Sequence, residues 1–163
     1  MNSLSSMAES VGALLKERGE TVAVSESSCA GLISASLVAI PGASAYYVGG
    51  AVIYTRVSQR GLLGVPDEAM EGMRASTEAY ARLNARKIRE SLATTWALSE
   101  TGASGPTGNR YGDAAGHACI AVAGPVDRSI TVETADEDRE ANMWAFTEKA
   151  LELLERCVRE SAS

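Results

Sequence analysis

Residue types that often carry catalysis or cross-linking are scarce in this chain. Its 163 residues include one histidine, three cysteines and only 5% aromatic residues. Cys29, Cys119 and Cys157 are odd in number and widely spaced, which is typical neither of a disulfide framework nor of a zinc site. We therefore expect three separate thiols and no bound metal or cofactor. A histidine-based catalytic device would have to use His117, which enters an apolar strand, where histidine more often has a structural role.

Basic runs and long hydrophobic runs are also missing. The formal net charge is -6, with acidic and basic residues interspersed, so no basic patch of the kind that binds nucleic acid is evident. No stretch reaches the roughly 18 consecutive apolar residues that a membrane span needs, and the start lacks the basic and apolar regions of a signal peptide. We expect a cytoplasmic protein that binds neither nucleic acid nor membrane.

The composition is that of a globular domain with a small, aliphatic core. Apolar residues make up 45% of the chain and charged residues 22%. A chain of this length can bury one core of ordinary size but is short for two. We therefore predict a single domain over residues 1–163.

Hydrophobic periodicity and chain-breaking residues predict an alternation of helices and strands. We expect helices over residues 3–18, 30–40, 56–64, 79–92 and 136–160, with a short helical segment over 66–73. We expect strands over residues 21–25, 46–55, 94–99, 117–123 and 129–134, the last two joined as a hairpin. Helices between the early strands and a late hairpin favour an α/β sandwich with a mixed sheet.

The stretch 22–33 runs from an apolar strand into the start of a helix. Its turn carries hydroxyl, thiol and carboxyl side chains, namely Ser25, Glu26, Ser27, Ser28 and Cys29. A helix start offers free N–H groups and a favourable dipole to an anion or an oxyanion. The same residue types are common helix caps, so the pattern leaves a structural cap and a functional turn both open. Cys29 is likewise either an activated thiol or a small buried hydrophobe.

A second candidate is the stretch 100–112, which contains four glycines and a proline after the strand over 94–99. A loop of this length in a compact domain is uncommon unless it binds something, the alternative being a flexible connection. The chain has no Gly-Lys pair for a phosphate-binding loop, and this stretch lacks the dinucleotide-binding spacing. In the strand over 46–55, Gly49 and Gly50 indicate a bulge or a close approach of another backbone.

The succession of motifs resembles the CinA C-terminal domain family, also called the PncC nicotinamide mononucleotide amidohydrolase family. Glu26, Ser27 and Gly31–Ile33 match its Glu-Ser-Cys-Thr-Gly-Gly-Leu-Ile signature. Pro41–Tyr47, followed by two glycines, is similar to its Pro-Gly-Ser-Ser-Ala-Tyr and Gly-Gly stretch. Further similarities follow in order at Tyr54, Leu62–Val65, Gly102, Gly105, Pro106, Gly116, Asp138 and Arg139. The resemblance extends from about residue 5 to about residue 158.

The resemblance implies a three-layer α/β/α sandwich that forms a homodimer or a higher homo-oligomer. It also implies a small-molecule substrate, the carboxamide of nicotinamide mononucleotide or a related phosphorylated amide, which is hydrolysed to the carboxylate and ammonia. Ser27 matches the nucleophile, Tyr54 a nearby tyrosine that could relay a proton, and backbone N–H groups around Ser28–Ala30 would hold the oxyanion. The loop over 102–107 and Arg139 would hold ribose and phosphate. The substrate-binding residues implied in this way are Glu26, Ser28, Cys29, Ala30, Gly31, Gly50, Thr101, Gly102, Ala103, Ser104, Gly105 and Arg139.

One departure from the family pattern bears directly on catalysis. Aligned without gaps from Tyr54, the family's lysine falls on Gln59, and Arg56 and Val57 stand where Asn and Glu occur. A neutral amide cannot act as a general base, and the loss of a base lowers a rate by about a hundred- to ten-thousandfold. Arg60 stays protonated and cannot replace the lysine.

Three hypotheses therefore remain. The first is an amidohydrolase that uses Ser27, with position 59 in the catalytic set. The second is a catalytically impaired nucleotide-binding or regulatory protein on the same fold. The third is an enzyme with a different substrate, in which Tyr54 or Cys29 assists Ser27.

Overall fold

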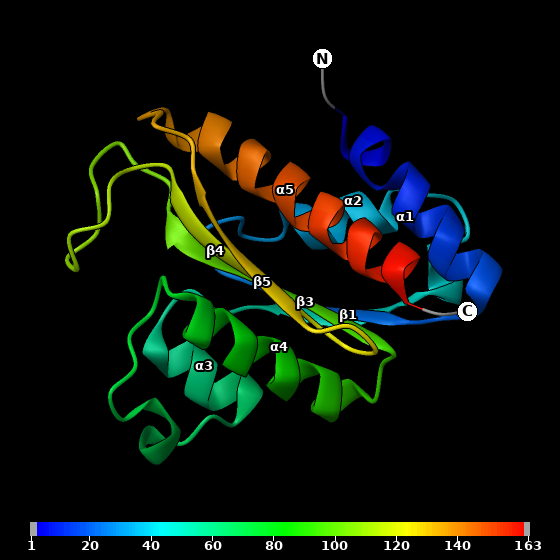
Figure 1. The fold of residues 1–163 in the computed structure, drawn as a ribbon, viewed down its shortest axis with the longest axis horizontal. Helices are drawn as coiled ribbons and strands as arrows, with labels where there is room; N and C mark the ends of the chain where they lie inside the picture. The colour runs from blue at the N-terminus through cyan, green and yellow to red at the C-terminus, as the bar shows by residue number, and fades with distance from the viewer. Residues whose placement is uncertain (1–2, 162–163) are drawn as a thin grey trace.

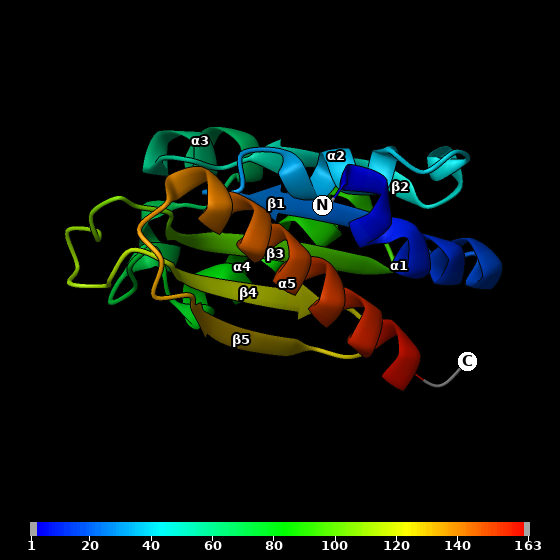
Figure 2. The same cartoon turned by 90° about the horizontal axis from the view of Figure 1, so that it is seen from above.

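The computed structural model describes residues 3–161, and a mixed sheet of five strands organises them. The strands are β1 (Val22–Glu26), β2 (Tyr47–Val52), β3 (Trp96–Ala103), β4 (His117–Ala123) and β5 (Arg128–Glu133). Their order across the sheet is β2-β1-β3-β4-β5, which can be followed in Figure 2. β1 is parallel to both β2 and β3, and β4 is antiparallel to β3 and β5. The predicted mixed sheet and late hairpin are confirmed.

Helices cover both faces of this sheet (Figure 1). One face carries α1 (Leu4–Arg18), α2 (Leu32–Val38) and α5 (Arg139–Glu160), and the other carries α3 (Arg56–Leu63) and α4 (Glu78–Leu92). Two short 3₁₀ helices, η1 (Ala43–Ala45) and η2 (Asp67–Met70), lie in the connections. The three-layer α/β/α sandwich is confirmed. The single-domain prediction for residues 1–163 includes four terminal residues outside the described range and stays a prediction.

Most helix ends coincide with caps that the sequence supplies. The Ser3 hydroxyl accepts the N–H of Ser6 at the start of α1, and Gly19 ends the helix with a φ of +66°. Thr55 caps α3 in the same way, and the Asp138 carboxylate accepts the N–H of Ala141 at the start of α5. These side chains satisfy amides that have no partner within the helix.

Two predicted boundaries next to the 22–33 turn were wrong. The helix predicted over 30–40 begins at Leu32, because Ala30 and Gly31 have φ values of +54° and +105° and lie in the turn. The strand predicted to end at residue 99 continues to Ala103, because β4 pairs with it as far as His117. Residues 100–103 therefore belong to β3, and only residues 104–116 form the loop, which extends beyond the sheet in Figures 1 and 2.

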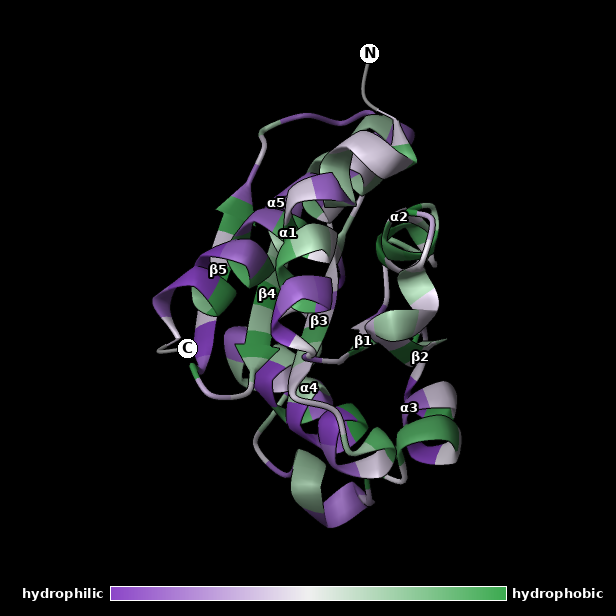
Figure 3. Ribbon diagram, turned by 90° about the vertical axis from the view of Figure 1, so that its right-hand side faces the viewer, coloured by the Kyte–Doolittle hydropathy of each residue, from purple (hydrophilic) through white to green (hydrophobic). Residues whose placement is uncertain are grey.

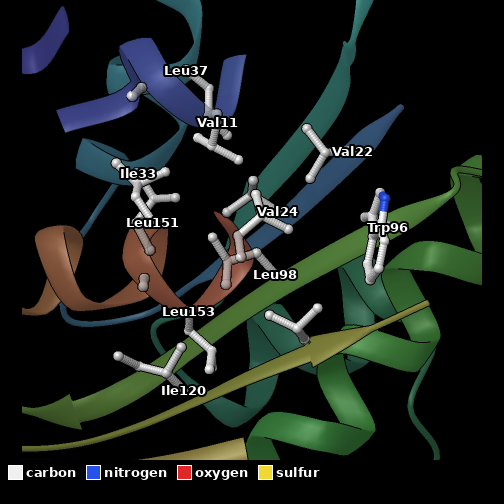
Figure 4. Close-up of a cluster of buried hydrophobic side chains, with 14 of the residues drawn as sticks. Val11, Val22, Val24, Ile33, Leu37, Trp96, Leu98, Ile120, Leu151 and Leu153 are labelled. Carbon is white, nitrogen blue, oxygen red and sulfur yellow. The ribbon is translucent and has the colours of Figure 1, made fainter. Parts of the chain in front are cut away.

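Alternate residues of the central strands supply the two halves of the core. Val22, Val24 and Leu98 face α1, α2 and α5, where Figure 4 shows them packed with helix side chains such as Val11, Ile33 and Leu151. The opposite face packs against α3 and α4 through smaller side chains that include Ala23, Ala97 and Ala121. α2 and β4 are among the hydrophobic ribbon segments in Figure 3. The expected aliphatic core, with many small residues, is confirmed.

This topology places the carboxyl ends of two parallel strands side by side. Ser25 of β1 pairs with Ser99 of β3 one residue before the strands reach Glu26 and Glu100. Ligands of open α/β sheets bind outside the carboxyl ends of parallel strands. The turn that follows β1 is thus at the edge of the sheet where a site is expected.

Gly50 provides a test of the close packing between β2 and β1. A Cβ atom at Gly50 would lie 2.7 Å from the Val24 carbonyl oxygen and 2.9 Å from the Tyr47 hydroxyl. We expect Gly50→Ala to lower the free energy of unfolding by about 1–3 kcal/mol, because the backbone of β1 cannot yield easily. Urea denaturation measures the change.

The matched control is Gly61→Ala in α3, where nothing lies within 4 Å of the added Cβ atom. Alanine is the better helix former, so this variant should be more stable by up to about 1 kcal/mol. A Gly50→Ala protein as stable as Gly61→Ala would contradict the close approach.

Candidate active site

The turn between β1 and α2 is organised by two buried carboxylates, Glu26 and Glu100, each 1% exposed. Glu100 Oε2 accepts the backbone N–H groups of Ser27 and Cys29, both at 3.0 Å. Its other oxygen accepts the Ser28 hydroxyl. Glu26 accepts the amides of the first turn of α2, those of Gly31, Ile33 and Ser34, at 2.8–3.0 Å. The two side chains fix the path of the chain on both sides of Ser27.

Glu100 lies on β3 and supports the turn from there. The sequence prediction of the site did not include it. Burial raises the pKa of its carboxyl, against the opposing effect of the hydrogen bonds from Ser28, Cys29 and Ser27. A carboxyl side chain in a strand that begins with the apolar residues 96–98 requires partners, because an unpaired buried carboxylate is costly. That signal is present in the sequence WALSETGA of β3, although it does not say where the partners lie.

Cys29 has the environment of a buried hydrophobe. It is 0% exposed, and burial together with the neighbouring Glu100 raises its pKa well above the ordinary value. A reactive cysteine needs the opposite shift and access to solvent. The structure therefore favours the packing role for Cys29 over the activated thiol.

The backbone amides of the turn are largely engaged within the chain. Of the three amides expected to hold an oxyanion, that of Cys29 donates to Glu100 and that of Ala30 donates to the Ser27 carbonyl at 3.0 Å. Among the described residues this leaves the Ser28 amide for a ligand. Glu100 accepts its bonds from backbone N–H groups and from Ser28, so it supports the turn.

Ser27 lines a pocket of about 150 Å³ beside this turn. Two other predicted site residues, Tyr54 and Thr101, line it as well, and Tyr54 is 59% exposed. The remaining lining residues come from the start of α3, the segment before and within α4, and the loop after β3: Thr55, Arg56, Met70, Met73, Arg74, Ala75, Tyr80 and Tyr111. The structure thus brings together residues from positions 27 to 111.

Several of these lining residues carry no recognisable signal in the sequence. Arg74 pairs with Asp113 at 2.8 Å and lies over the ring of Tyr111, 4.8 Å from its centroid. Tyr111 belongs to the glycine-rich stretch that the sequence singled out. Arg74 lies between η2 and α4, in a segment with no motif, so its place in the pocket depends on tertiary packing.

Gln59 lies inside the α3–α4 interface and is 0% exposed. Its Nε2 donates to Asn84 Oδ1 of α4 at 2.8 Å, and its Oε1 accepts Arg56 Nη1 at 3.1 Å. It does not line the Ser27 pocket. Arg56, one helical turn earlier, is the α3 side chain that borders the pocket.

Arg139 connects two of the predicted site segments. Its Nη1 donates to the Gly105 carbonyl at 2.5 Å, and its Nη2 donates to the Tyr54 hydroxyl at 3.0 Å. This places the start of α5, the loop after β3 and the connection between β2 and α3 next to one another. The other substrate-binding residues implied by the resemblance lie outside the lining of the pocket: Glu26, Ser28, Cys29, Ala30, Gly31, Gly50, Gly102, Ala103, Ser104 and Gly105.

A larger, open depression lies elsewhere on the surface, with a volume of about 810 Å³. Leu14, Arg18, Thr95 and Pro125 are among its lining residues. It contains none of the predicted site residues. The chemistry-bearing side chains therefore identify the smaller pocket beside Ser27 as the candidate active site.

Comparison with known proteins identifies the family to which this fold belongs. Residues 4–158 match the family model of the CinA C-terminal domain. The chain belongs to the CinA C-terminal domain family. The resemblance inferred from the motifs is confirmed over the whole range that was predicted.

Relatives of this CinA C-terminal domain include CinA-like proteins of Nostoc sp. and Gloeobacter violaceus. The Nostoc protein is 40% identical over 122 residues, which are 75% of this chain and 29% of the relative. The Gloeobacter protein is 38% identical over 152 residues, which are 92% of this chain and 36% of the relative. The chain thus spans about a third of the length of these curated relatives.

Solved structures share the same fold. A CinA superfamily protein from Klebsiella pneumoniae superposes with a TM-score of 0.90 at 23% identity, covering 97% of this chain and 99% of that protein. The competence/damage inducible protein CihA from Agrobacterium tumefaciens gives a TM-score of 0.89 at 25% identity, covering 98% of each chain. These likenesses confirm the α/β architecture of the CinA C-terminal domain.

The single histidine of this CinA C-terminal domain is held in a structural position. His117 Nε2 lies 2.9 Å from the Ser76 carbonyl oxygen, and its Nδ1 lies 2.5 Å from a Glu133 carboxylate oxygen. It joins β4 to β5 and to the segment before α4. Within residues 3–161, no helix combines the length and hydropathy that a membrane span requires. The same residues contain no group of three His, Cys, Asp or Glu side chains arranged to hold a metal ion.

His117 gives the CinA C-terminal domain a pH-dependent stability. Burial opposes its protonation, but the Glu133 carboxylate, the Ser76 carbonyl and Asp113 outweigh burial, so the pKa of His117 is raised above its usual value. The stabilisation that protonated His117 contributes to the folded state is fully present below the unfolded pKa of about 6.5. It is lost as the pH rises through the pKa of His117 in the folded state.

We expect the free energy of unfolding to fall as the pH rises from about 6.5 through the raised pKa of His117. In His117→Gln this fall should be reduced or absent. Urea denaturation at a series of pH values measures it in both proteins. An unchanged pH dependence in the variant would show that His117 is not the titrating group.

Proposed function

We propose that this domain is an amidohydrolase, which converts the carboxamide of nicotinamide mononucleotide, or of a related small phosphorylated amide, to the carboxylate and ammonia. The observation that carries the proposal is the position of Ser27. Its side chain borders a pocket at the carboxyl ends of parallel strands, on a turn fixed by buried carboxylates, together with Tyr54 and Thr101. Membership of the CinA C-terminal domain family supports it.

In the proposed reaction, Ser27 Oγ attacks the carbonyl carbon of the amide and forms a tetrahedral intermediate. We assign the resulting oxyanion to the Ser28 amide, because the Cys29 and Ala30 amides already have acceptors within the chain. Collapse of the intermediate releases ammonia and leaves an ester on Ser27, which water then hydrolyses to the carboxylate. The nitrogen must gain a proton as it leaves. In the proposal that proton is the one that Ser27 loses on attack, and the Tyr54 hydroxyl, which accepts a hydrogen bond from Arg139, relays it from Ser27 Oγ to the nitrogen.

A second candidate function is a nucleotide-binding or regulatory domain with impaired catalysis. The observation that favours it is the chemistry of the pocket lining, which among the described residues contains no lysine, histidine or carboxylate. Serine is a poor nucleophile until a base takes its proton. Gln59 cannot supply that base, because it is neutral and is bound to Asn84 and Arg56 away from the pocket.

The third hypothesis, a different substrate, now depends on Tyr54 as the partner of Ser27. Cys29 is buried beneath the turn, where burial raises its pKa. Assembly as a homodimer or higher homo-oligomer also stays a prediction.

Ser27→Ala tests the nucleophile. We expect the substitution to lower ammonia release from nicotinamide mononucleotide by at least about a thousandfold, because the covalent route is removed. Binding of the mononucleotide, measured by calorimetry, should change little. Ser91→Ala, on the exposed side of α4, is the control and should retain turnover.

The outcomes separate the hypotheses. Ammonia release by the wild-type domain that persists in Ser27→Ala would overturn the role of Ser27. Mononucleotide binding without ammonia release in the wild-type domain would favour the binding domain. Neither binding nor release would point to a different substrate.

A double substitution tests whether the missing lysine limits the rate. In Gln59→Lys alone, the new ammonium group would be buried next to the Arg56 guanidinium, where like charges repel. Arg56→Asn combined with Gln59→Lys removes that repulsion. If the base is what is missing, the double variant should release ammonia about a hundred- to ten-thousandfold faster at saturating substrate.

Arg56→Asn alone is the matched control and should show no such increase. Circular dichroism and urea denaturation establish that each variant is folded. A folded double variant that binds the mononucleotide and gains no activity would refute the missing base as the cause.

A further inference from the structure

The pocket beside Ser27 is bordered by two guanidinium groups. Arg56 approaches it from the start of α3, and Arg74 approaches it from the segment between η2 and α4. The other described lining residues are hydroxyl, aromatic, thioether and small side chains. Both charges that border the pocket are therefore positive.

Arg56 is held in place by contacts on the side away from the pocket. Its Nη1 donates to Gln59 Oε1 at 3.1 Å, and its Nη2 donates to the Val65 carbonyl at 3.0 Å and to Asp67 Oδ1 at 2.9 Å. A guanidinium has five N–H donors, so three bonds leave two donors for a ligand. The side chain is 29% exposed, which reduces the screening of its charge by water.

Arg74 is fixed in a comparable way from the opposite part of the chain. Nη1 donates to the Ala75 carbonyl at 3.1 Å and to Asp113 Oδ2 at 2.8 Å, and Nη2 lies 3.4 Å from the other oxygen of Asp113. The guanidinium also lies over the Tyr111 ring. These contacts fix the rotamer of Arg74 before a ligand binds. Binding through its remaining N–H donors therefore costs less side-chain entropy.

The acidic partners offset only part of the positive charge at the pocket. Arg56 and Arg60 share the single carboxylate of Asp67, which is 73% exposed and therefore well screened by water. Asp113 lies behind Arg74 and does not line the pocket. Three guanidinium groups thus share two carboxylates, and the groups that face the cavity are cationic.

The size of the cavity limits what can occupy it. A volume of about 150 Å³ is smaller than the roughly 300–1,000 Å³ of a typical pocket for a drug-sized ligand. It accommodates one oxyanion and part of a ring, and a complete mononucleotide would extend beyond it. Tyr80 and Tyr111 supply aromatic surface for the part that enters.

We propose that Arg56 and Arg74 form an anion subsite beside Ser27, which binds the phosphate or the carboxylate group of the ligand. A planar guanidinium donates two parallel hydrogen bonds to either group, so both are recognised by the same chemistry. The subsite rests on the proposed function for the identity of the ligand. This position differs from the one that the resemblance implied for the phosphate, which is the loop over 102–107 with Arg139.

Two observations favour the new position over the loop. Arg139 does not line the pocket beside Ser27, whereas Arg56 and Arg74 do. The open cavity along the loop is lined by Glu137 together with residues such as Pro106 and Thr107, and no arginine or lysine borders it among the described residues. A carboxylate beside a bound phosphate would repel it.

Direct binding measurements on the full chain test the subsite. Inorganic phosphate, nicotinate and the neutral nicotinamide are titrated by calorimetry at low ionic strength. We expect at least one of the two anions to bind, and Arg56→Gln and Arg74→Gln each to weaken it by about tenfold or more, since charge-assisted hydrogen bonds are lost. Binding of nicotinamide should change little in either variant.

Arg60→Gln is the matched control. Arg60 shares Asp67 with Arg56 but does not line the pocket, so anion affinity should stay within about twofold of the wild-type value. Arg74→Gln leaves the contacts of α3 intact, so it tests the subsite even if Arg56→Gln fails to fold. Preferential binding of phosphate would identify the substrate's phosphate as the occupant, and preferential binding of nicotinate would identify the carboxylate product.

Binding of neither anion, or an equal loss in Arg60→Gln, would overturn the subsite. These readouts do not depend on turnover. Anion binding that requires both arginines in a domain that releases no ammonia would keep the subsite and reject the amidohydrolase. If the domain releases ammonia but neither arginine substitution changes anion binding, the amidohydrolase is kept and the subsite is rejected.

Discussion

The hydrogen bonds that Glu100 accepts from the turn after β1 are the interaction on which the site depends. One buried carboxylate receives two backbone amides and a hydroxyl from three consecutive residues, Ser27, Ser28 and Cys29. It comes from the neighbouring parallel strand, so the pairing of β1 with β3 and the shape of the turn are mutually dependent. Glu26 likewise accepts backbone amides from the first turn of α2. Ser27 is therefore positioned by the sheet itself.

The fold around this turn was largely predictable because local signals and global packing agree. The caps of α1 and α3, the alternation in the strands and the late hairpin are all visible in the sequence. The errors arose where tertiary interactions prevail. Ala30 adopts a left-handed conformation that alanine disfavours, because the adjacent amides are held by Glu100 and Glu26. β3 extends through Thr101 and Gly102 because β4 pairs with those residues, in spite of the loop-like composition.

The candidate site was predictable only in part. The turn that carries Ser27, and Tyr54, could be located by resemblance to a family. Arg56 and Arg74 could not, since an arginine near a turn has no distinguishing sequence context. The burial of Gln59 also required the structure, because its meaning comes from Asn84, which lies 25 residues away in the chain. Replacement of a lysine by glutamine there removes a charge and at the same time provides a hydrogen-bonded link between α3 and α4.

The loop over residues 104–116 contacts the pocket at more than one wall. Its Gly105 carbonyl accepts the Arg139 side chain that also binds Tyr54. Its Asp113 pairs with Arg74, and its Tyr111 borders the cavity directly. A displacement of this one segment would remove both the carbonyl that holds Arg139, the partner of Tyr54, and the carboxylate that holds Arg74. The placement of a hydroxyl and of a guanidinium in the lining of the pocket is thus coupled through a single loop.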